Sequence, residues 1–343
     1  MCKVITYNEI NREAWSRLVR ESRAGTWFQS PAAYEFFSGQ PELFRPFAFG
    51  IEYDGTLRGV CCGYVTVEKS ALKQFLTRRA IIVGGPCFAD DCTDDAVVVL
   101  MNAVREQLKS QSIYVETRNF NDYSKWRKAF EAAGFCYQPH LNFHVHTDRP
   151  WEEIEANIGK HRRKYVRLSF RDGATIKELK NEGVNELENI KLLKDYYAIL
   201  QDLYKTKVKM PLQPWSFFEK LYHLDSCRFL LVMYDGQVVG GSTCMLLPGR
   251  GVYEWYACGK DGVYKNIHPS SVTKYAGMKY AADNRFAVFD MMGAGKPDEE
   301  YGVRDFKAEF GGEMVEHGRW LCVTKSLLYR IGVLGVKILK KLK

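Results

Sequence analysis

The chain has 343 residues, of which 46% are hydrophobic and 26% charged, and a formal net charge of +8. This composition excludes a disordered chain and a membrane-spanning one, and the length exceeds a usual single core, so we expect a folded protein with two domains. The ten cysteines include no CxxC pair and lie scattered in apolar runs. They predict buried thiols, no metal site and a reducing, cytoplasmic environment, which the absence of an apolar signal core at the start also indicates.

The excess of positive charge lies in two segments. Residues 160–171 and residues 325–343 each contain six basic residues and no acidic one. Such blocks favour an anionic partner, which is a phosphate, a nucleic acid or a lipid headgroup.

The chain contains two similar halves. Residues 47–65 and 229–247 both show an apolar strand, a Tyr-Asp-Gly turn and a second strand, a pattern typical of a β-hairpin. In each half a further apolar strand, a helical segment and a short strand follow. Each half then ends in a short helix that stops at a glycine, and in a last strand: FEAAGFCYQPHLNFHV in the first half and FKAEFGGEMVEHGRWLCV in the second. Lys307 stands where the first half has Glu131.

This order of elements predicts an α+β fold, with two tandem acyltransferase-like domains that each have a mixed twisted sheet flanked by helices. A doubly wound nucleotide-binding fold would alternate strands and helices strictly. The segment HTDRPW separates two regions that show the hydrophobic patterns of strands and helices. We therefore place the first domain at 1–148, the second at 149–325 and a basic amphipathic helix at 326–343.

Five segments in order along the chain resemble the FemABX family, whose members are peptidoglycan aminoacyltransferases built from two GNAT-like domains. They are TWFQSPAAYEFF, RRAIIVGGP, KHRRKYVRLSFRDGATI, YEWYACGKDGVYKNIHPSSV and DFKAEFGG. The resemblance covers nearly the whole chain. It implies transfer of an aminoacyl group from aminoacyl-tRNA to an amine of a nucleotide- or lipid-linked cell-envelope precursor, with no cofactor. Two features depart from the family pattern: Tyr34 replaces its early tryptophan, and no sustained heptads predict its coiled-coil arm.

The resemblance also assigns site residues. Aminoacyl transfer passes through a tetrahedral oxyanion, which requires positive charge or N–H donors. By resemblance, Phe306 and Lys307 line the donor site, where Lys307 stabilises the developing charge or the tRNA end, and Tyr256 lies at the acceptor cleft. Spacing alone instead favours a solvated helix lysine for Lys307 and a core or rim residue for Tyr256. Strand alternation predicts that Glu254 and Tyr256 share one face and that Trp255 lies on the other.

Three arginines predict a phosphate site. Arg163, Arg167 and Arg171 recur at four-residue spacing and would share one face of a helix. Their guanidinium groups suit the diphosphate of the family's acceptors, whereas the alternative is a solvated charged face. The segment Gly84-Gly85-Pro86 is either a phosphate cradle or a tight turn. The loop from Gly293 to Gly302 is a candidate gate of the site.

Other activities remain open on the sequence. A CoA-dependent GNAT domain carries a Q/R-x-x-G-x-G/A loop, and no convincing copy is present, which argues against ordinary CoA use. An acyl-CoA-dependent N-acyltransferase acting on an amino sugar is nevertheless the alternative enzyme. Outside enzymes, a degenerate duplicate could bind RNA or anionic lipid through its basic segments.

The C-terminal segment predicts an amphipathic helix that is too charged to span a bilayer. It either lies on an anionic membrane surface or docks on the fold. Its apolar face comprises Leu328, Ile331, Leu334, Ile338 and Leu342.

Overall fold

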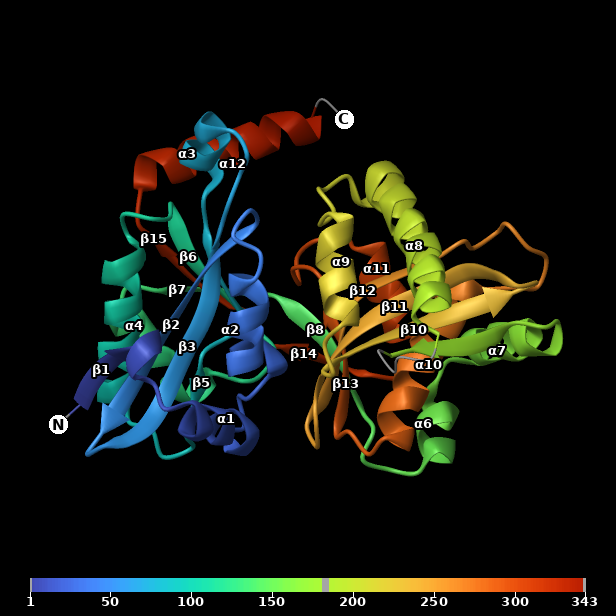
Figure 1. Cartoon of the computed structure of the whole chain (residues 1–343), viewed down its shortest axis with the longest axis horizontal. Coiled ribbons are helices and arrows are strands. Elements are labelled where there is room, and N and C mark those ends of the chain that lie inside the picture. The colour runs from blue at the N-terminus through green and yellow to red at the C-terminus, as the bar shows by residue number, and fades with distance from the viewer. Residues whose placement is uncertain (1, 181–184, 342–343) are drawn as a thin grey trace. The chain divides into compact units, whose positions relative to one another are not determined.

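The computed structural model describes residues 2–180 and 185–341, with residues 336–341 as backbone alone, and the chain forms two compact units (Figure 1). The first unit combines Met1–His140 with Glu316–Lys343, and the second is Leu141–Val315. This division differs from the predicted boundaries at 148 and 325. The reason is that the last strand of each half pairs in the sheet of the other half.

The first unit is built on an eight-stranded sheet with the order β1-β2-β3-β4-β6-β15-β7, in which β5 pairs with β3. Its late strand β15 lies between β6 and β7 and is antiparallel to both. The strands are β1 (Cys2–Thr6), β2 (Phe44–Tyr53), β3 (Thr56–Thr66), β4 (Ala80–Gly84), β5 (Cys87–Phe88), β6 (Tyr114–Asn119), β7 (Cys136–Gln138) and β15 (Arg319–Val323).

Helices of the first unit complete its core. Valine, leucine and methionine side chains of α4 pack with Val115, Phe130 and Trp320 against the sheet. The helices are α1 (Arg12–Glu21), α2 (Pro31–Ser38), α3 (Ala71–Thr77), α4 (Asp94–Leu108), α5 (Arg127–Ala132) and α12 (Ser326–Lys341), and short 3-10 turns lie at Tyr7–Glu9, Trp27–Gln29 and Ser124–Trp126.

The second unit has a seven-stranded sheet with the order β14-β8-β13-β12-β11-β10-β9. Its strands are β8 (Leu141–His146), β9 (Thr175–Leu179), β10 (Cys227–Tyr234), β11 (Gln237–Leu247), β12 (Gly251–Gly259), β13 (Val288–Gly293) and β14 (Glu313–Glu316). Its helices are α6 (Trp151–Asn157), α7 (Lys160–Arg171), α8 (Glu186–Leu203, extended by a π-helical turn at Tyr204–Val208), α9 (Trp215–Tyr222), α10 (Pro269–Asp283) and α11 (Gly302–Ala308).

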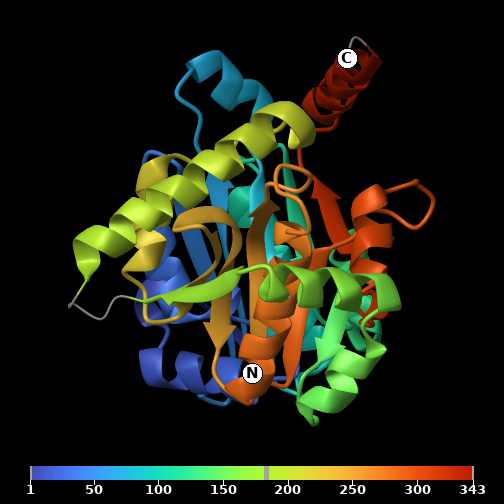
Figure 2. The ribbon, with the colours of Figure 1, turned by 90° about the vertical axis from the view of Figure 1, so that its right-hand side faces the viewer.

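Helices cover both faces of this second sheet. On β11, Thr243 bonds to Tyr196 of α8, whereas its neighbour Cys244 lies in the cluster formed with Ala276 of α10. Because successive strand residues point to opposite faces, α8 and α10 lie on opposite sides of the sheet. Helix α7 crosses α10 on the outer side (Figure 2).

The predicted repeat is present in the structure. Hairpins β2–β3 and β10–β11 turn at Asp54-Gly55 and Asp235-Gly236. All four turn residues have positive φ, 47° and 75° in the first turn and 49° and 70° in the second. A two-residue type I′ turn requires this conformation, which explains why Asp-Gly occurs in both halves.

The Gly84-Gly85-Pro86 segment is a packed turn. Both glycines have positive φ, and a Cβ on Gly85 would lie 2.5 Å from the hydroxyl oxygen of Tyr123. That hydroxyl donates a hydrogen bond to the carbonyl of Pro86 at 2.6 Å. Of the two interpretations of this segment, the structure therefore fits the tight turn.

The cysteines are all free thiols, and all except Cys2 and Cys136 are buried. The predicted C-terminal helix is α12. Of its predicted apolar face, Leu328 is half-buried and Ile331 and Leu334 are exposed, whereas the side chains of Ile338 and Leu342 lie outside the described residues.

Candidate active site

The central parallel strands of the second unit diverge. Strands β12 and β13 pair only where Gly251, Val252 and Tyr253 meet Val288, Phe289 and Asp290, although β12 continues to Gly259. The corresponding parallel strands of the first unit, β4 and β6, pair over five successive residues, from Ala80 to Gly84 on β4. Within the described residues, this early divergence thus distinguishes the second half from the first.

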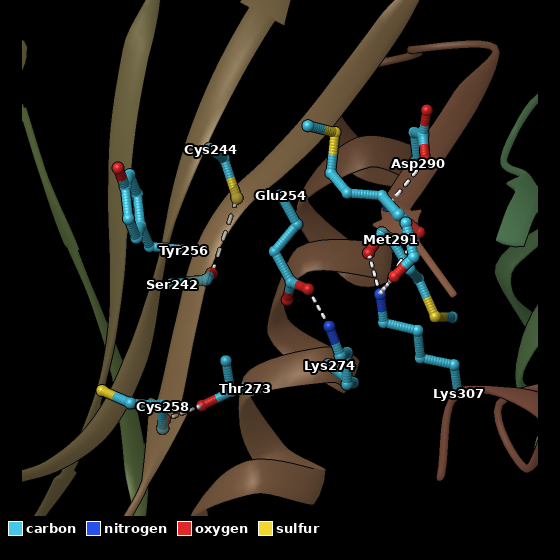
Figure 3. Close-up of polar contacts among 12 residues, drawn as sticks. Ser242, Cys244, Glu254, Tyr256, Cys258, Thr273, Lys274, Asp290, Met291 and Lys307 are labelled. Carbon is cyan, nitrogen blue, oxygen red and sulfur yellow. Dashed lines mark hydrogen bonds and ion pairs between the residues drawn. The ribbon is translucent and has the colours of Figure 1, made fainter. Parts of the chain in front are cut away.

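A buried ion pair lies at this divergence. Glu254, the first residue of β12 beyond the paired stretch, contacts the ammonium group of Lys274 on α10 (Figure 3). Both side chains are almost fully buried. Burial, and next the positive charge of Lys307, lowers the pKa of Lys274. The Oε1 atom of Glu254 accepts no hydrogen bond from any described residue.

Lys307 of α11 fills the other side of the divergence. Its Nζ donates hydrogen bonds to the carbonyls of Met291 at 2.5 Å, Gly293 at 2.8 Å and Met292 at 3.2 Å. An ammonium group has three protons, so these carbonyls use all of them. The residue is 6% exposed, which excludes the solvated helix lysine, and burial lowers its pKa to about 8.

A bulge in β13 creates the ring of carbonyls. Between Asp290 and Gly293 the strand has one more residue than β8 has between His144 and Asn142, and Met292 has a φ of 61°. The backbone N–H of Met292 donates to Oδ1 of Asp290 at 2.6 Å. Oδ2 of Asp290 lies 3.4 Å from Nε2 of His144. Although burial opposes it, the charge of Asp290 raises the pKa of His144.

Phe306 points toward α7, away from the carbonyls that bind its neighbour Lys307. The guanidinium carbon of Arg162 lies 4.5 Å from the centre of the Phe306 ring, a cation–π contact. Arg162 also pairs with Glu309 at 2.9 Å and donates to the hydroxyl of Ser271 at 3.3 Å. The arginine of α7 that contacts a predicted donor residue is therefore Arg162, which the sequence did not single out.

The predicted arginine stripe lies on a helix, as expected, because α7 spans Lys160–Arg171. Arg167 and Arg171 are exposed and Arg163 is half-buried. Arg171 pairs with Asp172 at 2.7 Å. Arg163 and Arg167 form no ion pair with a carboxylate of the described parts of the chain, so both remain available to an anion.

Tyr256 lies on the opposite face of the sheet from Glu254. Strand β12 has a bulge: Thr243 and Cys244 of β11 pair with Tyr256 and Glu254, so Trp255 is an extra residue. The rings of Trp255 and Tyr256 both lie against α9, where the centre of the Tyr256 ring is 4.9 Å from that of Phe218. The prediction that Glu254 and Tyr256 share one face is therefore wrong, because the extra residue breaks the alternation. Figure 3 shows Tyr256 pointing away from Lys274.

A carboxylate from the loop between β12 and α10 lies at the N-terminus of α10. The backbone N–H of Ser270, in the first turn of α10, donates to the carboxylate of Asp261 at 3.1 Å. Free N–H groups at a helix N-terminus attract phosphate or carboxylate groups. In this chain the carboxylate of Asp261 already satisfies one of them.

The predicted gate loop is held by Arg304 of α11, which donates hydrogen bonds to the carbonyls of Lys296 at 2.7 Å and of Glu299. A cavity of about 730 Å³ lies along this loop. It is lined by Pro297, Asp298, Glu299, Glu300, Tyr301, Gly302, Arg304 and Asp305.

A family model described as an acetyltransferase (GNAT) domain matches residues 160–307, a range that contains Glu254, Lys274 and Lys307. Among solved structures, the crystal structure of FemX is similar over 96% of this chain and 99% of its own length, with 14% sequence identity and a TM-score of 0.72. The chain has the tandem GNAT fold of FemX. The predicted fold class is thereby confirmed.

Two further structures share this tandem GNAT fold. One is L-PGS from Bacillus licheniformis, at 12% identity and a TM-score of 0.57, covering 94% of this chain and 96% of its own. The other is a tandem GNAT protein from the clavulanic acid biosynthesis pathway, at 9% identity and a TM-score of 0.56, covering 94% of this chain and 99% of its own. No curated protein matches the sequence. Both the matched domain and the fold are those of acyltransferases.

Proposed function

We propose that this tandem GNAT protein is an aminoacyltransferase that moves an aminoacyl group from aminoacyl-tRNA to an amine of a peptidoglycan or other cell-envelope precursor. The main observation in favour is the pair of lysines at the strand divergence of the second unit. Lys274 and Lys307 are the only buried lysines among the described residues, and both lie in the range that matches the GNAT domain. Burying two cations is costly, so a functional reason for them is expected.

The chemistry needs a positive charge or N–H donors beside the reacting carbonyl, and Lys307 is proposed to supply the charge. The amine attacks the carbonyl carbon of the ester, a C–N bond forms, and the carbonyl oxygen becomes an oxyanion. When the intermediate collapses, the C–O bond to the tRNA ribose breaks, the ribose hydroxyl leaves with a proton, and the amine loses one. In our proposal the oxyanion takes the place of one backbone carbonyl as a hydrogen-bond acceptor of Lys307. The carbonyl of Met292 is the one displaced, because its hydrogen bond, at 3.2 Å, is the longest of the three.

Glu254 and Lys274 are proposed as positioning residues for Lys307. Burial lowers the pKa of Lys274 most, and the repulsion between its ammonium group and that of Lys307 lowers it further. The carboxylate of Glu254 offsets this repulsion, so that Lys307 can remain protonated in a buried place. Phe306 and Arg162 provide a flat aromatic and cationic surface beside α11, suited to the terminal base of a tRNA.

The N-terminus of α10 favours this donor over acyl-CoA. A CoA pyrophosphate at that helix end would compete with the carboxylate of Asp261, which already accepts the N–H of Ser270. The alternative remains an acyl-CoA-dependent N-acyltransferase that acts on an amino sugar. Its support is the shared fold of the clavulanic acid pathway protein, whose structure is described as being without AcCoA.

For the acceptor, we propose that Arg163 and Arg167 bind the phosphates of a nucleotide- or lipid-linked precursor, since both lie on α7 without an ion-pair partner in the described chain. Tyr256 is proposed to hydrogen-bond the acceptor from the α9 side of the sheet. A second acceptor class is suggested by the fold shared with the C-terminal domain of a protein described as a lysylphosphatidylglycerol synthetase, at a TM-score of 0.60. In that case the product would be an ester on a lipid headgroup.

The test supplies purified protein with UDP-linked muramyl pentapeptide and a mixed pool of charged tRNAs, and detects amide product by mass spectrometry. The proposal expects a product that disappears after ribonuclease treatment and in Lys307→Met. The matched control is Lys191→Met, which changes an exposed lysine of α8. Turnover with acyl-CoA and none with charged tRNA would support the alternative enzyme, and full turnover in Lys307→Met would remove that residue from the mechanism.

A further inference from the structure

Helix α3 of the first unit exposes an apolar face that its own fold does not cover. None of the residues of α3 is buried. Leu72 is 68% exposed, Phe75 50% and Leu76 37%. Their spacing of three and four places them on one side of the helix. Single exposed apolar residues are ordinary, but three on one side of a short helix form an apolar patch of the kind that marks a protein or membrane interaction site.

Helix α12 adds a second apolar face beside the first. It lies against α3 (Figure 1), although the two are separated by more than 240 residues of sequence. Leu327 is 71% exposed, Ile331 50% and Leu334 59%, and their spacing again places them on one helical side. Helix α12 is anchored at its start, where Tyr329 packs edge-on against Tyr114 of β6. The two helices together form what we term the α3–α12 surface.

The charges around this surface are of one sign. Residues 69–79 contain four basic residues and no acidic one, and residues 325–343 contain six basic residues and no acidic one. The two sets of basic residues lie close together. The pKa of Lys325, next to α12, is lowered first by burial and second by the charge of Arg78, next to α3. Lys73 and Arg330 are exposed on the helices themselves.

The charge distribution distinguishes between possible occupants. A second copy of the chain, bound through a two-fold contact, would bring the same basic residues face to face, and the repulsion would oppose association. An anionic bilayer provides the opposite sign next to an apolar interior, which suits helices with exposed leucine and phenylalanine flanked by lysine and arginine. None of the described helices is long and apolar enough to cross a membrane.

We propose that the α3–α12 surface docks the protein on an anionic lipid bilayer, with both helices lying in the headgroup region and their leucine and phenylalanine side chains inserted. Leu72, Phe75, Leu327 and Ile331 are the inserting residues. Lys73 and Arg330 bind the phosphate groups of the lipids. This inference does not depend on the proposed function, because binding to vesicles requires no substrate.

The experiment is co-flotation of the full chain with vesicles of phosphatidylcholine alone and of equal parts phosphatidylcholine and phosphatidylglycerol. The expected result is binding to the anionic vesicles, weakened by added salt, and little binding to the neutral ones. The variants Leu72→Ser/Phe75→Ser and Leu327→Ser/Ile331→Ser each lower the affinity, by about tenfold or more. Because these side chains are exposed, the thermal midpoint of each variant stays at the wild-type value.

Charge variants and controls complete the test. Lys73→Gln and Arg330→Gln each lower the affinity for anionic vesicles by about fivefold. Lys128→Gln on α5 and Val99→Ser on α4 change an exposed basic and an exposed apolar residue of the same unit, and leave binding unchanged. Failure of the wild type to float with anionic vesicles, or unchanged flotation of the α3 and α12 variants, would overturn the proposal. So would a dimer in sedimentation that Leu327→Ser/Ile331→Ser abolishes, which would assign the surface to a second copy.

Discussion

Removing one partner of the Glu254–Lys274 ion pair should destabilise the second unit much more than removing both. Glu254→Gln leaves the ammonium group of Lys274 buried beside that of Lys307, and Lys274→Met leaves a buried carboxylate without its counter-charge. Breaking a buried pair in this way costs about 3–5 kcal/mol of the free energy of unfolding, whereas replacing both partners with apolar groups is often neutral or stabilising. We therefore expect a large loss in each single variant and a small one in Glu254→Met/Lys274→Met.

The pH dependence provides a second measure of the same effect. The folded pKa of Lys274 lies below its ordinary value of 10.5, so between the two values the unfolded chain binds more protons than the folded one. Stability therefore rises with pH across that window, as the buried lysine becomes neutral. In Glu254→Gln we expect the folded pKa of Lys274 to fall further, so the stability deficit of this variant is largest at low pH, where Lys274 is charged in both folded proteins, and shrinks as the pH is raised. Lys274→Met lacks the group and shows no such recovery.

The assay is urea unfolding followed by tryptophan fluorescence and circular dichroism, with wild type, both single variants and the double variant measured over a range of pH. Lys279→Met is the matched control, because Lys279 pairs with Asp283 on the outer side of the same helix and should contribute less than about 1 kcal/mol. Two outcomes would refute the coupling between Glu254 and Lys274. In one, each single variant loses no more free energy of unfolding than Lys279→Met. In the other, the double variant loses the sum of the two single losses.

Three further predictions concern activity. Turnover should fall as the pH rises through about 8, because burial lowers the pKa of Lys307 to about 8 and only its ammonium form stabilises an oxyanion; a flat kcat profile there would contradict this role. Arg163→Ala/Arg167→Ala should raise the KM for a phosphate-bearing acceptor by about tenfold or more with little change in kcat. Lys164→Ala on the same helix should leave this KM unchanged. If the double arginine variant has the KM of the wild type, the arginines form a solvated face instead. Tyr256→Phe keeps the ring contact with Phe218, so a lower kcat at an unchanged thermal midpoint would report on the hydroxyl, and an unchanged kcat would remove Tyr256 from the site.

The parts of the fold that the sequence predicted are those set by local chemistry. Asp54-Gly55 and Asp235-Gly236 specify tight turns wherever they occur, so both hairpins were predictable. The sheet in which each last strand lies was not predictable in the same way. Strands β8 and β15 are both short, and their choice of partners depends on pairings made across the whole chain.

The site was predictable only in part for a similar reason. Lys307 was identified because the segment DFKAEFGG resembles the family, and its burial and carbonyl partners became evident only in the structure. Glu254 and Lys274 were missed as a pair: a charged residue inside an apolar strand is a signal for a buried partner, but the sequence of α10 has no distinct apolar side that would mark Lys274. The wrong face for Tyr256 follows from a bulge, which inserts one residue and leaves no mark in the pattern of side chains.

The interior position of β15 determines the order in which a ribosome can complete this protein. The second unit ends at Val315, so all of its strands are available before Arg319–Val323 has been synthesised. Until then β6 has an open edge and β7 has no neighbour, since β15 is the strand that joins them. The half that is synthesised first is thus finished last, and any chain truncated before residue 319 carries an unclosed sheet that invites aggregation.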